Sequence, residues 1–219
     1  MASGALRLVK NVGLLGSVAG QVCSLVTLCI PQWLTLSSGL LESEKYTLGL
    51  WETCVTQDTG GRVCQASASL RELAAEMLVA RILMCGACVV GSLGLVAVLL
   101  GPTCVRYGAH QGSSLERRTN IAGGALFLLA GLATLVPVSY VAHVTVQKFW
   151  GPEFPTHVPR WDYGDAMFSG WIGGFFLLTG GLLLIVSQLC ANRLAETPAS
   201  FPSKLDFSRK VSFTKVDFV

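Results

Sequence analysis

The stretch that decides the fold runs from residue 33 to residue 64 and reads WLTLSSGLLESEKYTLGLWETCVTQDTGGRVC. Its spaced residues are Trp33, the tripeptide Gly49-Leu50-Trp51, and the cysteines Cys54 and Cys64. Seventeen residues separate the two tryptophans, two separate Trp51 from Cys54, and nine separate the cysteines. Long uncharged stretches lie on both sides of this segment, and they indicate whether it lies in solvent or beside a membrane.

Four stretches without Asp, Glu, Lys or Arg dominate the chain, which is 52% hydrophobic and 13% charged. A soluble domain usually has about 25% charged residues, whereas a bilayer core of about 30 Å is crossed by about 20 apolar helical residues. The stretches do not alternate in polarity as membrane-spanning strands would, so we expect four transmembrane helices. We place them at about residues 11–30, 77–103, 120–146 and 166–190.

Basic residues indicate the orientation of these helices. With the N-terminus inside the cell, ten of the sixteen Lys and Arg residues lie in cytosolic segments. Positive charge is enriched there, so we expect both termini to be cytosolic, and the net charge of +3 gives no reason to expect nucleic acid as a partner. A cleaved signal peptide is the alternative for the first stretch, although a nineteen-residue uncharged run is long for that role.

This topology predicts outer loops of about residues 31–76 and 147–165 and a cytosolic tail over 193–219. In the first loop, residues 46–56 favour a strand, 58–61 favour a turn, and 62–65 favour a short return strand. Such a hairpin would place Cys54 opposite Cys64. Because disulfides persist outside the cell, we expect these cysteines to be bonded, which is worth roughly 3 kcal/mol for a loop of this size.

Several features near the spans have two interpretations. Ser69 and Glu72 match a capping box, which predicts a helix starting there and running into the second span. Arg81 can extend its guanidinium to the membrane surface or form an ion pair that anchors the outer loop. Glycines at helical spacings can pack the bundle of one chain or join two chains. Three tryptophans can form contact sites or an interfacial belt: Trp150, Trp161 and Trp171.

The first-loop spacing, from Trp33 through Gly49-Leu50-Trp51 to the two cysteines, resembles the signature of the claudin family. Three further segments are similar to that family: Leu78-Val79-Ala80-Arg81, Phe149-Trp150-Gly151-Pro152 and the last five residues, KVDFV. Gly151 departs from the acid or amide usual in the second loop, which suggests a less-studied member. The resemblance implies a membrane α+β fold, in which a left-handed four-helix transmembrane bundle carries a small extracellular antiparallel sheet.

Claudins polymerise side by side within one membrane and meet head-on between cells. The resemblance therefore implies a structural and adhesive component of tight-junction strands, with other claudins as partners. It places an apolar side-to-side anchor at Leu70 and the receiving pocket of a neighbour at Phe149, Trp150 and Tyr163. Pro152 and Phe154 complete the implied lateral and trans contacts. The tail resembles a ligand of PDZ scaffold proteins, formed by Asp217, Phe218 and Val219.

Charges along the first loop would act on ions passing through a strand, because fixed charges exclude ions of like sign. Six acidic residues stand against three basic ones in residues 31–76, which weakly favours cations. Gln65 stands where a cation-conducting member has Asp, so both a barrier and a pore stay open. The candidates for charge selectivity are Glu42, Glu44, Asp58, Arg62 and Gln65.

Other classes of function have less support. Cys85 and Cys88 form a C-x-x-C pair within a span without the charged neighbours that redox catalysis needs. The three histidines lie on different sides or at different depths, so we expect no metal, no cofactor and no enzyme.

Cys104 and Cys190 are juxtamembrane candidates for S-palmitoylation or unmodified thiols, with membrane lipid as the partner. The alternative function is an auxiliary subunit that modulates a channel or receptor, since related four-span families share the GLW and the cysteine pair.

Overall fold

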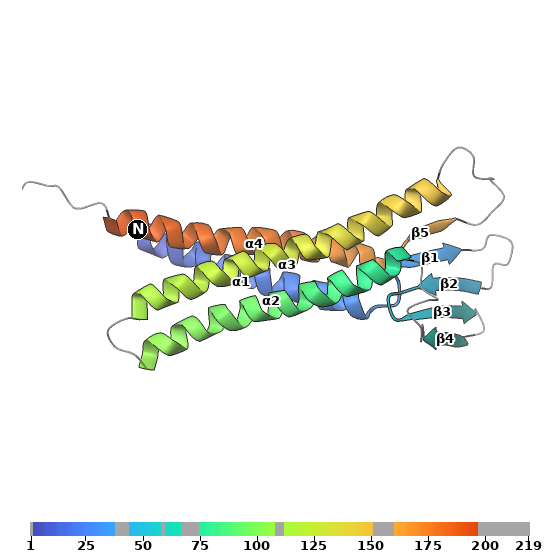
Figure 1. The fold of residues 1–219 in the computed structure, drawn as a ribbon, viewed down its shortest axis with the longest axis horizontal. Coiled ribbons are helices and arrows are strands. Elements are labelled where there is room, and N and C mark those ends of the chain that lie inside the picture. The colour runs from blue at the N-terminus through green and yellow to red at the C-terminus, as the bar shows by residue number, and fades with distance from the viewer. Residues whose placement is uncertain are drawn as a thin grey trace, which may run out of the picture.

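The computed structural model describes residues 2–37, 44–57, 60–66, 75–107, 112–150 and 160–196. Four long helices lie side by side, and a small sheet sits at one end of them (Figure 1). The helices are α1 (Ala2–Cys29), α2 (Ala75–Tyr107), α3 (Gly112–Phe149) and α4 (Asp165–Glu196). The N-terminus and the last turn of α4 both lie at the end opposite the sheet. The two ends of the described chain are therefore on the same side of the bundle.

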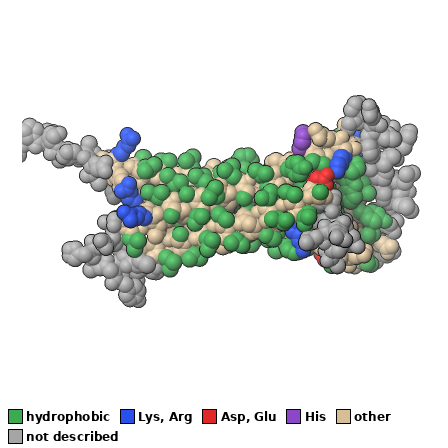
Figure 2. Space-filling view, viewed as in Figure 1, with side chains coloured by type: hydrophobic (Ala, Val, Ile, Leu, Met, Phe, Trp, Pro, Cys, Tyr) green, Lys and Arg blue, Asp and Glu red, His purple; other side chains and the backbone are tan. Residues whose placement is uncertain are grey.

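All four helices are long and apolar enough to cross a membrane. Hydrophobic side chains cover the visible length of the bundle, and Lys and Arg lie at its two ends (Figure 2). The helices extend beyond the expected spans: α1 begins well before residue 11, α3 runs from Gly112 to Phe149, and α4 continues to Glu196. Charged residues end an apolar run without ending a helix, because Lys, Arg and Glu are good helix formers.

The sheet has five antiparallel strands in the order β4-β3-β2-β1-β5. They are β1 (Leu34–Ser37), β2 (Glu44–Leu48), β3 (Glu52–Gln57), β4 (Arg62–Ala66) and β5 (Trp161–Tyr163). The pairing of Leu34 with Tyr163 joins the two outer loops in one sheet. The membrane α+β fold is thus confirmed, but β1 and β5 were not predicted.

The expectation of one strand over residues 46–56 is wrong. Gly49, Leu50 and Trp51 interrupt it and form the turn between β2 and β3, in which the Gly49 N–H donates to the Glu52 carbonyl at 3.0 Å. A Cβ at Gly49 would overlap the backbone of Pro31, just after the end of α1. Only glycine fits so close an approach, and it allows the chain to turn where residues of high strand propensity would otherwise continue.

Glycines hold the helices of this one chain close together. A Cβ at Gly20 on α1 would lie 2.8 Å from the Gly173 carbonyl oxygen of α4, and one at Gly124 on α3 would lie 2.9 Å from the Gly181 oxygen of α4. Lipid supplies no hydrophobic drive between helices, so close backbone contact is an important source of attraction. Gly86 on α2 differs, because a Cβ there would meet nothing within 4 Å.

Polar side chains on the inward face of α1 add hydrogen bonds to the other three helices. Gln21 donates to the Cys88 carbonyl of α2 at 2.9 Å. The Ser24 hydroxyl lies 3.4 Å from that of Thr134 on α3, and the Thr27 hydroxyl lies 2.7 Å from that of Ser169 on α4. These bonds fix the rotation of α1, because an unpaired polar group in hydrocarbon is costly.

The core has two clusters. The first joins the sheet to the bundle and includes Trp33, Leu50, Met84, Val141 and Met167. The second lies within the bundle and comprises Val98, Phe127, Ala130, Leu177 and Leu184. The first cluster matters most for function, because it sets the position of the outer loops relative to the membrane.

Candidate functional site

Two tryptophans of the first-loop motif cap the C-terminal end of α1 with hydrogen bonds. The Trp33 indole N–H donates to the Thr27 carbonyl at 2.9 Å, and the Trp51 indole N–H donates to the Leu28 carbonyl at 2.8 Å. The last carbonyls of a helix have no partner within the helix, so these two bonds satisfy groups that water or lipid would otherwise have to reach. Trp33 and Leu50 are completely buried, whereas Trp51 is 40% exposed.

Arg81 connects α2 to this motif. Its guanidinium carbon lies 3.8 Å from the centroid of the Trp51 ring, which is a cation–π contact. Arg81 thus does anchor the outer region to α2, but through the face of an aromatic ring and not through the ion pair that we considered. A contact of this kind was not predictable from residue types alone, because it depends on where the turn after β2 places the indole.

Backbone contacts attach the second outer loop to the same place. The Gly164 N–H donates to the Trp33 carbonyl at 2.9 Å, and the Ala166 N–H donates to the Gln32 carbonyl at 3.1 Å. A Cβ at Gly164 would overlap the Gln32 carbonyl. The glycine therefore lets the start of α4 lie directly against the residues that follow α1, which brings β5 alongside β1.

Cys54 and Cys64 form a disulfide, as expected. They stand directly opposite each other in the pairing of β3 with β4, with Cα atoms 4.1 Å apart. Cys54 is buried, whereas every residue of β4 is exposed. The bond therefore attaches an exposed edge strand to the rest of the sheet. Glu52 lies near the two sulfurs, but because the disulfide occupies both, this group does not provide thiolate ligands for a metal.

A mostly apolar cavity of about 180 Å³ lies between the sheet and the outer ends of α2 and α3. Its walls include Leu34 of β1, Met77 of α2, Val141 and Phe149 of α3, and Trp161 of β5. At its rim, Lys148 forms an ion pair with Glu76 at 2.6 Å. Glu76 lies in the first turn of α2 and Lys148 in the last turn of α3, positions at which both charges suit the helix dipoles.

A second, more open cavity of about 310 Å³ lies beside the first. Trp150, Trp161 and Tyr163 line it, together with Val146 and Asp162. Trp161 borders both cavities. The Trp150 indole N–H donates to the Trp161 carbonyl at 3.4 Å, and the Arg160 guanidinium carbon lies 5.2 Å from the Trp150 ring centroid. Trp150 is 52% exposed, so an aromatic face is open to contact here.

Trp171 differs from Trp150 in its surroundings. Its indole N–H donates to the Ser139 hydroxyl at 3.3 Å, and its ring meets Tyr163 edge-on with centroids 5.8 Å apart. The Tyr163 hydroxyl in turn donates to the Ala142 carbonyl at 3.3 Å. These contacts tie β5 and α4 to α3. The ring of Tyr163 therefore both lines the second cavity and supports the junction between sheet and bundle.

The structure places some of the expected site residues and not others. Arg62 and Gln65 lie exposed on β4, and Cys190 is a free, exposed thiol on α4. Glu44 and Cys104 lie in β2 and α2, but their side chains are outside what is described. The following residues, with the capping-box pair Ser69 and Glu72, lie outside the described residues: Glu42, Asp58, Leu70, Pro152, Phe154, Asp217, Phe218 and Val219.

Sequence reasoning missed Met77, Glu76, Lys148 and Trp161 as walls or rim of the first cavity. Met77 stands at a predicted loop boundary and Trp161 lies within the predicted second outer loop, and no local pattern marks either residue as part of a cavity. The alternation of Leu34 with Thr35 and Leu36 was the available signal for β1. A strand at β1 has an edge that needs a partner, and β5, which contains Trp161, is that partner.

Comparison with known proteins agrees with this arrangement. A model of the PMP-22/EMP/MP20/Claudin family matches residues 8–184. Claudin-7 of Homo sapiens is 35% identical over 191 residues, which cover 85% of this chain and 88% of that protein. The chain belongs to the claudin family. Claudin-14 of Mus musculus is 34% identical, with 85% of this chain and 77% of that protein covered. Claudin-4 of Homo sapiens is 30% identical, with 91% and 93% covered.

The structure gives a physical reason for the spacing that resembles the claudin signature. The spacing that resembles the family signature corresponds to a set of contacts in which two indoles, one glycine and one arginine fix the sheet to the bundle. Membership also implies a structural, non-enzymatic membrane protein. The exposed aromatic faces and the two adjoining cavities are then candidate contact sites between proteins.

Proposed function

We propose that this claudin is a structural and adhesive component of tight-junction strands in the plasma membrane, with both termini cytosolic. It polymerises side by side within one membrane and meets other claudins across the intercellular gap, and so controls paracellular permeability. The observation that carries the proposal is the sheet held firmly on the four-helix bundle, with the aromatic cavities of Trp150 and Trp161 open beside it. A rigid outer sheet suits repeated contact, because it does not have to be ordered on binding.

The lateral contact uses the cavities as its receiving side. Phe149 lines the first cavity, and Trp150 and Tyr163 line the second. We propose that Leu70 of a neighbouring claudin supplies the apolar side chain that enters there, with Pro152 and Phe154 extending the contact. A cavity of about 180 Å³ has room for a leucine side chain, and burying such a side chain is worth roughly 1.5–3 kcal/mol.

This lateral contact can be tested by cross-linking. One tagged chain carries Leu70→Cys and a second carries Trp150→Cys, and both are expressed in the same cell and mildly oxidised. We expect a disulfide-linked dimer only when both variants are present. The matched control replaces Trp150→Cys by Gln65→Cys, which is exposed on β4 away from the cavities. Equal cross-linking to both partners would contradict the proposed contact.

Permeability follows from the exposed charges of the outer region. We propose that Arg62 and Gln65 on β4, with Glu42, Glu44 and Asp58, line the paracellular path. The acidic excess of the first loop weakly favours cations. If the strand is a barrier instead, expression raises transepithelial resistance without a change in ion preference. A dilution potential that favours chloride would contradict the preference for cations.

The cytosolic side offers two further contacts. We propose that Asp217, Phe218 and Val219 bind PDZ scaffold proteins through the free carboxylate, and that Cys104 and Cys190 accept palmitoyl chains that attach them to membrane lipid. Adding one residue after Val219 should abolish capture of the chain by PDZ scaffolds. Capture that persists with the added residue would refute the PDZ contact.

The junctional function is tested in epithelial cells that lack their own claudins. Expression of this chain should change the paracellular conductance of the cell layer, and Trp150→Ala should reduce that change while the protein still reaches the surface. No change in conductance, with normal surface expression, would favour the alternative of an auxiliary subunit that modulates a channel or receptor.

A further inference from the structure

The second cavity has the composition of a site for a cation. Three aromatic residues line it from the end of α3 and from β5, namely Trp150, Trp161 and Tyr163, and Val146 and Asp162 complete its wall. Aromatic faces carry partial negative charge, so several rings around one space attract a cation without any hydrogen bond. At about 310 Å³, the cavity is large enough for a small ligand group.

The aromatic rings are held by contacts on other sides. The Tyr163 hydroxyl donates to the Ala142 carbonyl of α3, and the Trp150 indole N–H donates to the Trp161 carbonyl at 3.4 Å. Trp161 and Tyr163 share one face of β5, because side chains alternate along a strand, and both pack against the core that joins the sheet to the bundle. Rings fixed in this way do not have to be ordered when a ligand binds.

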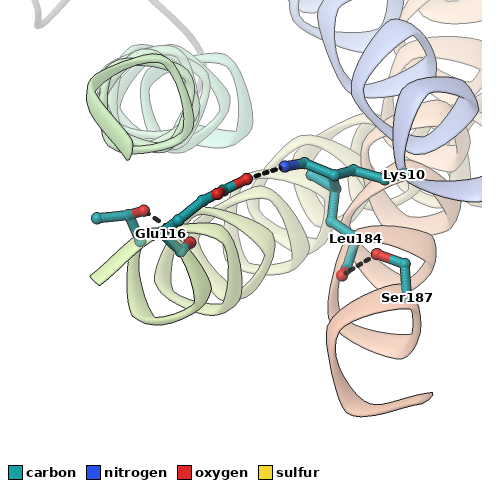
Figure 3. Close-up of polar contacts among 5 residues, drawn as sticks. Lys10, Glu116, Leu184 and Ser187 are labelled. Atoms are coloured by element: carbon teal, nitrogen blue, oxygen red, sulfur yellow. Dashed lines mark hydrogen bonds and ion pairs between the residues drawn. The ribbon is translucent and has the colours of Figure 1, made fainter. Parts of the chain in front are cut away.

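One acidic and one basic residue stand beside the rings. Asp162 is exposed on the opposite face of β5 and forms no ion pair with any described residue. By contrast, Glu116 at the other end of the bundle is paired with Lys10, with 2.6 Å between Oε1 and Nζ (Figure 3). The Arg160 guanidinium carbon lies 5.2 Å from the Trp150 ring centroid. A ligand with adjacent positive and negative groups suits these charges better than a simple cation.

The cavity lies at the level of the lipid headgroups in the expected topology. Val146, in its wall, is the last residue of the span expected over residues 120–146, and Trp150 directly follows the end of α3. Trp and Tyr are enriched at this level, because their rings are amphipathic. A phospholipid headgroup is therefore a ligand that is always within reach of these rings.

A trimethylammonium group suits the rings better than a basic protein side chain. Aromatic cages recognise quaternary ammonium ligands, which have no N–H and need no acceptor. A lysine or arginine side chain brings several donors, while the Trp161 carbonyl already accepts from Trp150. In phosphocholine, two carbons join the ammonium to a phosphate ester, which places an anion beside the cage. Arginine forms strong charge-assisted hydrogen bonds with phosphate, and Arg160 stands on that side of Trp150.

We propose that the second cavity binds the phosphocholine headgroup of a lipid in the outer leaflet. The trimethylammonium group lies among the rings of Trp150, Trp161 and Tyr163, and the phosphate contacts Arg160. Asp162 attracts the ammonium through its field, because charges this close are only partly screened at physiological salt. The first, apolar cavity stays available to a neighbouring claudin, so this inference does not depend on the junctional role.

The test titrates soluble lipids onto the full chain in maltoside micelles, with fluorotryptophan in place of tryptophan. Fluorine NMR follows each indole, and single Trp-to-Phe variants assign the signals. Dihexanoyl phosphatidylcholine should shift the signals of Trp150 and Trp161 until the site is saturated. Trp171, which lines neither cavity, is the internal reference. Dihexanoyl phosphatidylglycerol has the same acyl chains but no ammonium group, and it should leave all three signals in place.

Variants separate the two halves of the headgroup. Arg160→Gln should weaken binding of phosphatidylcholine about tenfold. It should not weaken binding of tetramethylammonium, which has no phosphate and is repelled by the arginine. Asp162→Asn should weaken both ligands. Trp150→Leu removes one ring and should weaken both about three- to thirtyfold, whereas Tyr163→Phe keeps its ring and is the matched control.

Three results would count against the site. Equal shifts with phosphatidylcholine and phosphatidylglycerol would overturn recognition of the quaternary ammonium group. Tighter binding of N-acetyl-arginine amide than of phosphatidylcholine would assign the cage to a basic side chain of another protein and exclude the lipid. Phosphatidylcholine binding that is unchanged in Arg160→Gln would overturn the phosphate contact. The first two comparisons need no variant of the cage, so they decide the matter even if Trp150→Leu does not fold.

Discussion

Trp51 joins three parts of the molecule through one side chain. Its N–H satisfies the Leu28 carbonyl at the end of α1, its ring supports the Arg81 guanidinium of α2, and its backbone belongs to the turn between β2 and β3. A tryptophan is the side chain that offers both a long apolar face and a single donor. This combination explains why the position requires an indole and not only an aromatic ring.

The two functions of Trp51 can be separated by a double-mutant cycle. Trp51→Leu removes both contacts, and Arg81→Gln removes the cation–π contact alone. We expect a coupling of about 0.5–1 kcal/mol between the two substitutions, and a further loss of about 1 kcal/mol for the indole hydrogen bond. Chemical unfolding of the purified protein in detergent measures both. Arg117→Gln, exposed at the opposite end, is the control, and strictly additive effects would argue against the contact.

Sequence reasoning located the residues of this motif but not their contacts. The spacing of Trp33, Trp51 and the cysteines was sufficient for the fold and for the disulfide. It did not reveal that Gly49 starts a turn, because local strand propensity runs through that position. The reason is the close approach of Pro31, which is set by the packing of the chain after α1 and has no local signal.

At the scale of the helices, the glycines differ in what a methyl group would meet. Gly20→Ala places a Cβ 2.8 Å from backbone atoms of Gly173 and Leu177, which cannot move independently of α4. We expect a loss of about 1–3 kcal/mol. Gly86→Ala is the matched control, because nothing lies within 4 Å, and it should stabilise α2 by about 0.5–1 kcal/mol. Thermal unfolding distinguishes the two, and equal effects would contradict the close packing of α1 on α4.

At the scale of the strands, the disulfide holds β4 to the sheet. Replacing both cysteines, Cys54→Ser with Cys64→Ser, should cost roughly 2–4 kcal/mol. Because β4 is an exposed edge strand, we expect its amide hydrogens, and those of β3 that pair with it, to exchange faster. Exchange in β1 and β5 should be nearly unchanged. Uniform acceleration across the sheet would mean that the disulfide supports the whole sheet, and Cys190→Ser is the control for thiol loss.

The strands also show where prediction from sequence stops. The hairpin of β3 and β4 was predictable because its turn residues and cysteines lie close together in the chain. β5 has only three residues, and its pairing with β1 joins Leu34 to Tyr163 across two of the four helices. No local pattern in the sequence indicates a pairing between two strands so far apart in the chain. The two cavities, which lie beside β5, were unpredictable for the same reason.

At the scale of the whole molecule, the two ends of the bundle differ. The sheet end presents aromatic cavities, an ion pair at their rim and an exposed edge strand. The opposite end carries both ends of the described chain, and basic residues lie at both ends of the bundle. This polarity is what a protein needs to make adhesive contacts on one side of a membrane and scaffold contacts on the other. Ten of the sixteen Lys and Arg residues lie in the segments expected to be cytosolic, which agrees with that orientation.

Contact between cells through the sheet end can be tested by one mixing experiment. The chain, with a fluorescent tag at its N-terminus, is expressed in cells without tight junctions, and these are mixed with cells that do not express it. We predict enrichment at borders between two expressing cells and none at borders with a non-expressing neighbour. Equal fluorescence at both kinds of border, with the protein at the surface, would contradict adhesion by the outer loops.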